Sequence, residues 1–91
     1  MKGKERAALR SRANALEAIQ QIGHAGVTEE IIKNVDMALD ARELIKLSVL
    51  ETCPSDAGET AAALARATGA EVIQVIGRKL VLYRYNPEKH T

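Results

Sequence analysis

Two glycines three residues apart could hold an anion in this 91-residue chain. Gly23 and Gly26 lie between an apolar stretch of strand length, residues 18–22, and a helix-like segment that follows Thr28. Glycine has no Cβ, so a bulky anion can approach its backbone closely. The first amides of a helix lack intrahelical partners and point toward the same place. A phosphodiester could therefore sit against this loop, as nucleic acid does on the GXXG loop of KH domains.

The same two glycines are also typical of a chain that simply turns sharply. Glu29 and Glu30 follow the expected N-cap and already complement the positive end of the helix. A phosphate would therefore have to approach from the glycine side. The glycine spacing alone leaves both interpretations open.

Cationic side chains precede this loop in a predicted helix over residues 4–16. Leu9, Ala13 and Leu16 form one apolar stripe at helical spacing, which is expected to dock while the arginines stay in solvent. An ordinary solvated helix face explains these charges equally well. Because the helix leads directly into the strand before the loop, both can lie near one edge of the domain. The basic residues concerned are Lys4, Arg6, Arg10 and Arg12.

The net charge is only +1, but the charges are unevenly distributed. Residues 1–17 carry five Lys or Arg against two Glu, and residues 78–91 carry four against one Glu. Residues 28–77 carry four Lys or Arg against nine carboxylates. If the fold brings the two ends together, one face becomes positive and attracts a polyanion.

Composition argues against an enzyme. There is no Trp or Phe to wall a small-molecule pocket, and the single cysteine excludes an internal disulfide and a four-cysteine metal site. Cys53 is interpreted as a small loop residue, since no motif marks it as a reactive thiol. His24 is its only candidate base, and nothing orients the pair. We therefore predict no catalysis, no cofactor, no metal and no small-molecule substrate.

Length and hydropathy indicate one globular domain over residues 1–91, with a core of about residues 4–85 and a frayed tail over 86–91. No run approaches the roughly 20 apolar residues of a membrane span, and no signal peptide is visible. The expectation is a cytoplasmic monomer that makes no membrane contact.

The remaining elements follow from helix caps and alternation. A second helix is predicted from Thr28 to near Arg42, and a third between an Asp56 cap and Gly69. Strands are predicted over residues 44–50, 72–76 and 79–85, the last two joined by a type II′ turn at Gly77-Arg78. The order α-β-α-β-α-β-β predicts an α/β fold, a two-layer sandwich with a four-stranded mixed sheet.

Five segments in register resemble the CRM domain, named for chloroplast RNA splicing and ribosome maturation. The likeness covers residues 4–85 and is to the stand-alone bacterial form, the YhbY-like proteins. The segments are KERAALRSRA at 4–13, IGHAGVTE at 22–29, ARELIKL at 41–47, ATGA at 67–70 and VIGRKLVLYR at 75–84.

The resemblance implies a fold similar to the C-terminal domain of bacterial translation initiation factor three. In that fold the strand order is 1-2-4-3, and the last strand is antiparallel to the others. The resemblance also implies RNA as partner, in particular ribosomal RNA of large-subunit precursors. The contacts implied are the neighbouring basic surface and the loop residues Gly23, His24, Ala25 and Gly26.

One residue departs from the family loop, which commonly carries lysine after its first glycine. Here His24 takes that place; an imidazole carries less positive charge at neutral pH but can still donate a hydrogen bond to phosphate. It can equally be a plain turn residue. If it contacts RNA, loop affinity is expected to be weaker and more pH-dependent than in relatives.

Two further interpretations stay open. Arg78 and Lys79 lie at the hairpin tip, where the family retains basic residues, and they serve either RNA contact or solubility. The alternative function is a protein-interaction adapter that uses the open face of the sheet. The polar positions Lys46, Ser48 and Gln74 argue against a large apolar patch there.

Overall fold

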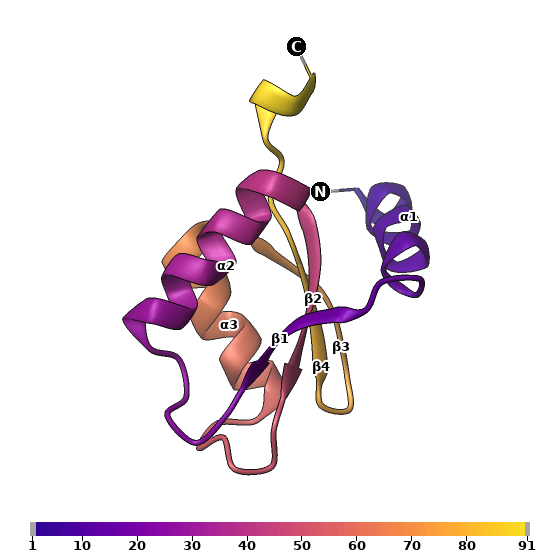
Figure 1. Ribbon diagram of the computed structural model, residues 1–91. Helices are drawn as coiled ribbons and strands as arrows, with labels where there is room; N and C mark the ends of the chain where they lie inside the picture. The colour runs from indigo at the N-terminus through magenta and orange to yellow at the C-terminus, as the bar shows by residue number, and fades with distance from the viewer. Residues whose placement is uncertain (1, 91) are drawn as a thin grey trace.

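The computed structural model describes residues 2–90, and its elements follow the predicted order. The helices are α1 Gly3–Ala13, α2 Glu29–Arg42 and α3 Ala57–Thr68, followed by a short 3-10 helix, η1 Pro87–His90 (Figure 1). The strands are β1 Ala18–Ile22, β2 Leu44–Val49, β3 Glu71–Ile76 and β4 Lys79–Tyr83. The predicted α/β fold class is confirmed.

The four strands form one mixed sheet in the order β1-β2-β4-β3. β1 runs parallel to β2, whereas β4 is antiparallel to both β2 and β3. This is the strand order that the resemblance implied. β1 pairs only with β2, so its outer edge is free in the part of the chain that the structure describes.

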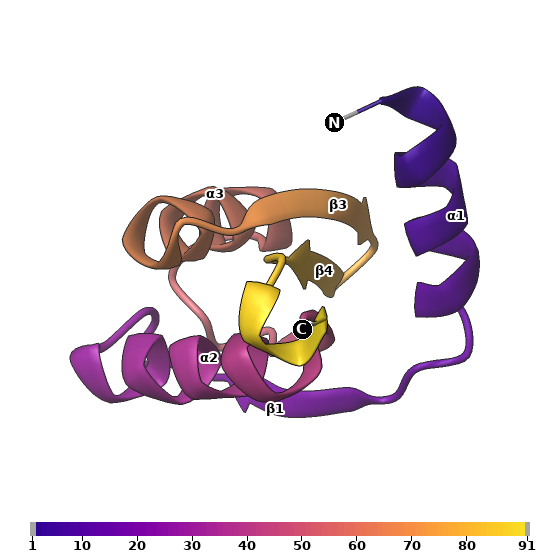
Figure 2. The ribbon, with the colours of Figure 1, turned by 90° about the horizontal axis from the view of Figure 1, so that it is seen from above.

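Helices lie on both faces of the sheet (Figure 2). α2 and α3 cover one face and enclose the main core, in which Leu39, Leu64 and Leu82 are fully buried. These two helices and the sheet form the expected two layers. α1 adds cover on the opposite face, because its buried Leu9 and Ala13 pack in a second cluster formed with side chains of β2, β3 and β4.

The predicted helix caps are present. The Thr28 side chain accepts a hydrogen bond from the Ile31 amide at 3.1 Å, and Asp56 Oδ1 accepts one from the Glu59 amide at 2.8 Å. Gly69 ends α3 with φ +75°, where glycine is favoured. α1 ends at Ala13 rather than at residue 16, and β4 ends at Tyr83 rather than at residue 85.

Arg84 joins α2, α3 and the end of β4. Its Nη1 donates to Asp36 Oδ1 at 2.6 Å and to the Thr68 carbonyl at 2.7 Å, and its Nη2 donates to Asp40 Oδ1 at 2.8 Å. The Arg84 side chain is 22% exposed. One of the cations counted in the basic C-terminal region is thus neutralised within the fold.

The C-terminal segment packs against the end of α2. The Asn86 amide donates to Glu43 Oε2 at 2.7 Å, and Lys89 Nζ donates to a carbonyl in the last turn of α2 at 2.6 Å. The prediction of a frayed tail is therefore wrong for residues 86–90, because polar groups of this segment satisfy groups at the carbonyl end of the helix. Thr91 lies outside the described residues.

Glu43 anchors this segment from an uncommon backbone conformation. Its φ of +64° lies in the left-handed region that favours glycine. Its carbonyl accepts the Arg84 amide at 2.9 Å, and both its carboxylate oxygens lie 3.0 Å from His90 Nε2. The hydrogen bond from Asn86 is the main cause that lowers the pKa of Glu43, against an opposing effect of burial.

We expect the C-terminal segment to detach from α2 as the pH falls below the usual range of a glutamate pKa. Because the folded pKa of Glu43 is lowered, its stabilising contribution is complete above the unfolded pKa and is lost as the pH falls through the folded value. The amide NMR signals of Asn86 and Lys89 report the release. Glu43→Gln should show released signals already at neutral pH. Signals that titrate identically in this variant would contradict the assignment.

Candidate nucleic-acid interface

The segment between β1 and α2 forms a tight turn with the two glycines at its ends. The Gly26 amide donates to the Gly23 carbonyl at 2.9 Å. His24 and Ala25 lie at the exposed tip of the turn. The helix cap Thr28 follows directly, so the four predicted loop residues and the start of α2 lie together.

The two glycines have different structural roles. Gly26 is buried with φ +68°, and a Cβ there would lie only 3.2 Å from Pro54 Cγ. Gly23 has no positive φ, and a Cβ there would make an ordinary 3.6 Å contact with Leu50 Cδ1. The fold therefore requires glycine at position 26 but not at position 23.

A hollow of about 400 Å³ lies beside the turn. Among the described residues that line it, the carboxylate is Glu30 and the group able to carry positive charge is His24. Gln20, Asn34 and Thr28 add neutral polar groups. An anion in this hollow would therefore depend on amide and side-chain hydrogen bonds more than on cations.

Two other segments lie at the same end of the strands as the glycine turn. The Leu50 amide donates to the Ile22 carbonyl at 2.9 Å, and the Val49 amide donates to the Arg78 carbonyl at 2.7 Å. These bonds place the β3–β4 hairpin tip beside the ends of β1 and β2. Arg78 is 3.1 Å from Glu51 in an exposed ion pair, whereas Lys79 is exposed and makes no ion pair among residues 2–90.

The basic helix α1 lies away from the glycine turn. Both views place α1 near the start of β1 and the turn beyond the end of that strand (Figures 1 and 2). Helix and loop therefore lie at opposite ends of β1 and not together, because the chain runs the full length of β1 between them (Figure 1). The predicted site thus divides into two regions.

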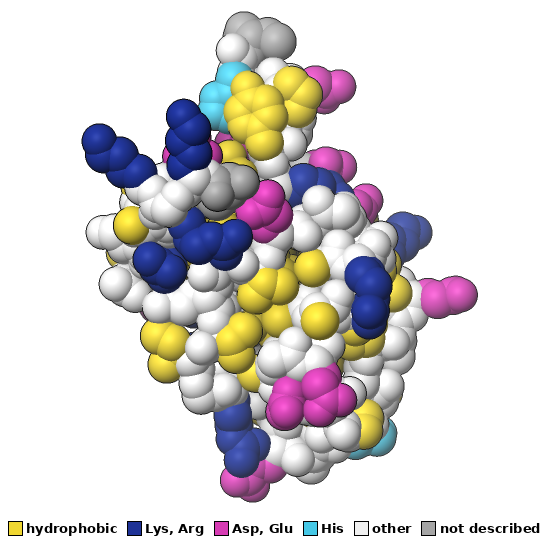
Figure 3. All heavy atoms as spheres, turned by 180° about the vertical axis from the view of Figure 1, so that it is seen from behind, with side chains coloured by type: hydrophobic (Ala, Val, Ile, Leu, Met, Phe, Trp, Pro, Cys, Tyr) yellow, Lys and Arg dark blue, Asp and Glu magenta, His cyan; other side chains and the backbone are white. Residues whose placement is uncertain are grey.

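The basic residues of α1 also differ from one another. Arg6 Nη1 donates to the Val72 carbonyl at 2.7 Å, and its Nη2 lies 3.4 Å from Glu71 Oε2, so Arg6 attaches α1 to β3. Lys4, Arg10 and Arg12 are exposed. Seen from behind, Lys and Arg side chains gather over α1, beside a band of hydrophobic side chains (Figure 3).

The sheet face that α1 leaves uncovered is mixed in character. Lys46 is opposite Val81 and Ser48 is opposite Lys79 in the β2–β4 register, and Gln74 is opposite Val81 on the other side. The hollow on this face is only about 120 Å³. The polar positions singled out in the sequence therefore lie together there and interrupt its apolar surface.

Two cations that sequence reasoning did not assign to a site lie at the start of the sheet. Arg42, the last residue of α2, and Lys46 of β2 line a hollow together with Arg12. Arg12 joins them because α1 packs on the sheet face opposite α2 and α3, for which the sequence carries no local signal. None of the helices described is long and apolar enough to cross a membrane.

Comparison with known proteins gives a consistent result. The CRS1 / YhbY (CRM) domain family matches residues 1–84. The probable RNA-binding protein YqeI of Bacillus subtilis is 43% identical over 86 residues, which cover 94% of this chain and 90% of that protein. A probable RNA-binding protein of Methanocaldococcus jannaschii is 39% identical over 84 residues, which cover 90% of this chain and 62% of that protein.

A solved structure is similar as well. The solution structure of a Staphylococcus aureus protein, described as a candidate RNA-binding protein, superposes with a TM-score of 0.80. The two sequences are 43% identical, and the match covers 94% of this chain and 90% of the other. Since the family match spans nearly the whole chain, this protein belongs to the CRS1/YhbY (CRM) domain family.

Proposed function

We propose that this protein binds RNA through the RNA backbone and acts in the cytoplasm, as a monomer, in maturation of the large ribosomal subunit. In this proposal the glycine turn, His24 and the hairpin-tip residues Arg78 and Lys79 contact the RNA at one end of β1. The exposed cations of α1 contact it elsewhere. Family membership and the names of the relatives support RNA as the partner. No chemical step is part of the proposal.

The observation that carries the proposal is the glycine at position 23. Neither backbone conformation nor crowding requires a glycine there, in contrast to position 26. A missing side chain that the fold does not need leaves the backbone of an exposed turn open. An open backbone of this kind suits a bulky anion such as a phosphodiester.

RNA affinity is expected to fall steeply with salt. If about 4–6 phosphates are neutralised, a plot of log K against log salt should have a slope of about −3 to −5, because bound cations release the counterions of the RNA. Fluorescence anisotropy of a labelled single-stranded RNA, measured between 50 and 300 mM KCl, gives this slope. Replacement of the exposed cation Arg10 by alanine should make the slope less steep by about one.

A flat salt response would reject the backbone-binding mode. A salt-insensitive dimer with no RNA affinity would instead favour a protein adapter that uses the uncovered sheet face. The assignment to ribosome maturation has a separate test, in which bound RNA is cross-linked to the protein in cells and sequenced. Cross-links confined to RNAs other than large-subunit precursors would overturn it.

A further inference from the structure

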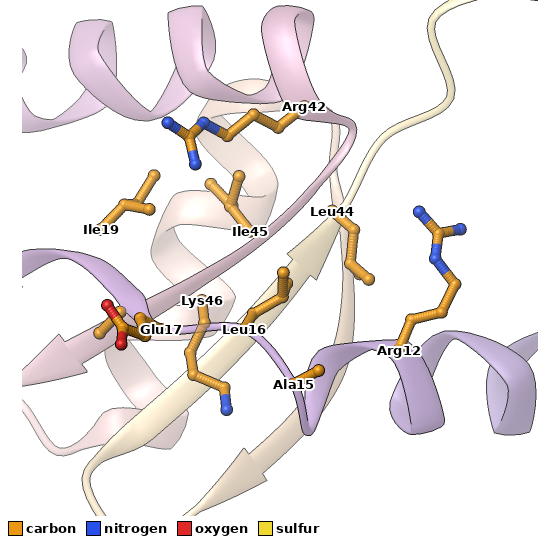
Figure 4. A pocket seen from close by; sticks show the side chains of 10 residues that line it. Arg12, Ala15, Leu16, Glu17, Ile19, Arg42, Leu44, Ile45 and Lys46 are labelled. Carbon is orange, nitrogen blue, oxygen red and sulfur yellow. The ribbon is translucent and has the colours of Figure 1, made fainter.

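A second hollow lies at the other end of β1 from the glycine turn. Its volume is about 590 Å³, within the range of roughly 300–1,000 Å³ typical of small-ligand sites. It is formed where the α1–β1 connection crosses the start of β2 and the end of α2 (Figure 4). We propose that this hollow, which we call the α1–β1 pocket, holds one unpaired nucleotide of the bound RNA. The inference rests on the proposed function.

The walls of the α1–β1 pocket suit a flat apolar ring. Leu16, Ile19 and Ile45 surround its middle (Figure 4). Ile19 is 40% exposed, although it is a large aliphatic side chain, and Leu16 is half-buried. Ile45 is only 1% exposed, so a base that packs here would remove from water the apolar surface of Ile19 and Leu16, which is favourable.

The rim of the pocket is cationic. Arg42 extends from the end of α2 toward Ile19, and the charged ends of Arg12 and Lys46 point outward on two other sides (Figure 4). Within residues 2–90 none of these three cations makes a hydrogen bond or an ion pair, in contrast to the engaged Arg6 and Arg84. They are thus free to bind a partner.

The charge balance selects the occupant. The residues that line the pocket include three cations and a single carboxylate, that of Glu17, so its net charge favours an anion. An apolar peptide would bury these cations without partners, at a considerable cost in desolvation. A nucleotide has both required parts, because its base covers the apolar walls and its phosphates reach the guanidinium and ammonium groups.

The α1–β1 pocket and the glycine turn lie at the two ends of β1. Ile19 lines the α1–β1 pocket, and the next residue, Gln20, lines the hollow beside the turn. The free edge of β1 runs between the two sites. One RNA strand can therefore lie along β1, with its backbone at the turn and one base in the pocket.

The test compares two double variants that change the net charge equally. Arg42→Gln/Lys46→Gln alters the pocket rim, and Lys33→Gln/Arg66→Gln alters exposed cations elsewhere on α2 and α3. Glutamine keeps much of the side-chain length, and thermal melting establishes that each variant folds. A short single-stranded RNA is titrated into each protein by anisotropy. The methyl NMR signals of Ile19 and Ile45 in the unchanged protein are recorded as the same RNA is added.

We expect the pocket variant to lose about 10-fold or more in affinity, because two charge-assisted contacts are removed, whereas the control loses less than about 3-fold. The Ile19 and Ile45 methyl signals should shift on RNA addition. If the two variants lose RNA affinity equally and the methyl signals do not shift, the inference is overturned, whereas the proposal that the protein binds RNA is not affected. Absence of RNA binding by the unchanged protein would refute the proposed function and the inference with it. A change in sedimentation of the pocket variant with unchanged RNA affinity would indicate a protein occupant and also overturn the inference.

Discussion

Replacement of Gly23 by aspartate is expected to weaken RNA binding by about 10- to 100-fold while leaving the protein folded. The fold accepts a side chain here, since a Cβ would lie 3.6 Å from Leu50 Cδ1 and the backbone has no positive φ. The added carboxylate would lie a few ångströms from a phosphate held by the turn. At that separation charge repulsion amounts to about 1–3 kcal/mol for the dielectric conditions near a protein surface. Anisotropy titration and thermal melting measure the two effects separately.

Two other variants make this result interpretable. Ala62→Asp adds the same charge at an exposed position of α3 and should change RNA affinity by less than about 3-fold. Gly26→Ala forces a side chain into a φ of +68° and to within 3.2 Å of Pro54 Cγ, so it should destabilise the fold by about 1 kcal/mol or more. Lost RNA binding in a Gly26 variant would therefore be ambiguous, which is why position 23 is the better probe. Equal RNA affinity of Gly23→Asp and Ala62→Asp would contradict a phosphate at the turn.

Local features of the sequence predict most of the fold. Thr28 and Asp56 mark helix starts because each side chain accepts a hydrogen bond from an amide that the helix leaves unpaired. In both cases the donor is only three residues further along the chain. Gly77 likewise predicts the hairpin from a local property, because a two-residue hairpin turn needs a positive φ that glycine adopts easily. The φ of Gly77 is +57°. The strand order itself was implied by the resemblance to the CRM domain, and the chain connectivity and the handedness of crossovers agree with it.

Long-range side-chain contacts could not be predicted in this way. Arg6, Arg84 and Lys89 count equally as basic residues in the sequence, yet each donates to a backbone carbonyl more than fifteen residues away. Their partners are backbone oxygens and isolated carboxylates, which leave no pattern in the residue types. The sum of charges at the two chain ends therefore overestimated the free positive surface.

The candidate site divides along the same line. The turn at Gly23 and Gly26 was predictable because its glycines are adjacent in sequence to the helix they precede. The distance between that turn and α1 was not predictable, because it depends on which face of the sheet the apolar stripe of α1 covers. The pattern of Leu9 and Ala13 would allow α1 to pack on either face of the sheet. The structure places both residues on the face opposite α2 and α3. That placement also brings Arg12 to the α1–β1 pocket.

Arg84→Met is expected to lower the free energy of unfolding by about 2 kcal/mol, one of the largest effects of a single change outside the core. The variant keeps side-chain length but removes the donors that reach the Thr68 carbonyl and the carboxylates of Asp36 and Asp40. A hydrogen bond to a charged group contributes about 1.5–3 kcal/mol. The carboxylates are 51% and 65% exposed, so water replaces part of the loss and the effect stays below that of a fully buried pair.

Thermal unfolding measures this effect, and for a domain of this size about 2 kcal/mol corresponds to a fall in Tm of roughly 8–16 °C. Arg84→Lys should give an intermediate Tm, because a single ammonium cannot reproduce the planar fork that bridges two helices. Arg66→Met is the matched control, since Arg66 is exposed and makes no hydrogen bond or ion pair within the described residues. If Arg84→Met and Arg66→Met melt at the same temperature, the Arg84 contacts do not hold α2 and α3 to the end of β4, and the stability of this arrangement must come from apolar packing alone.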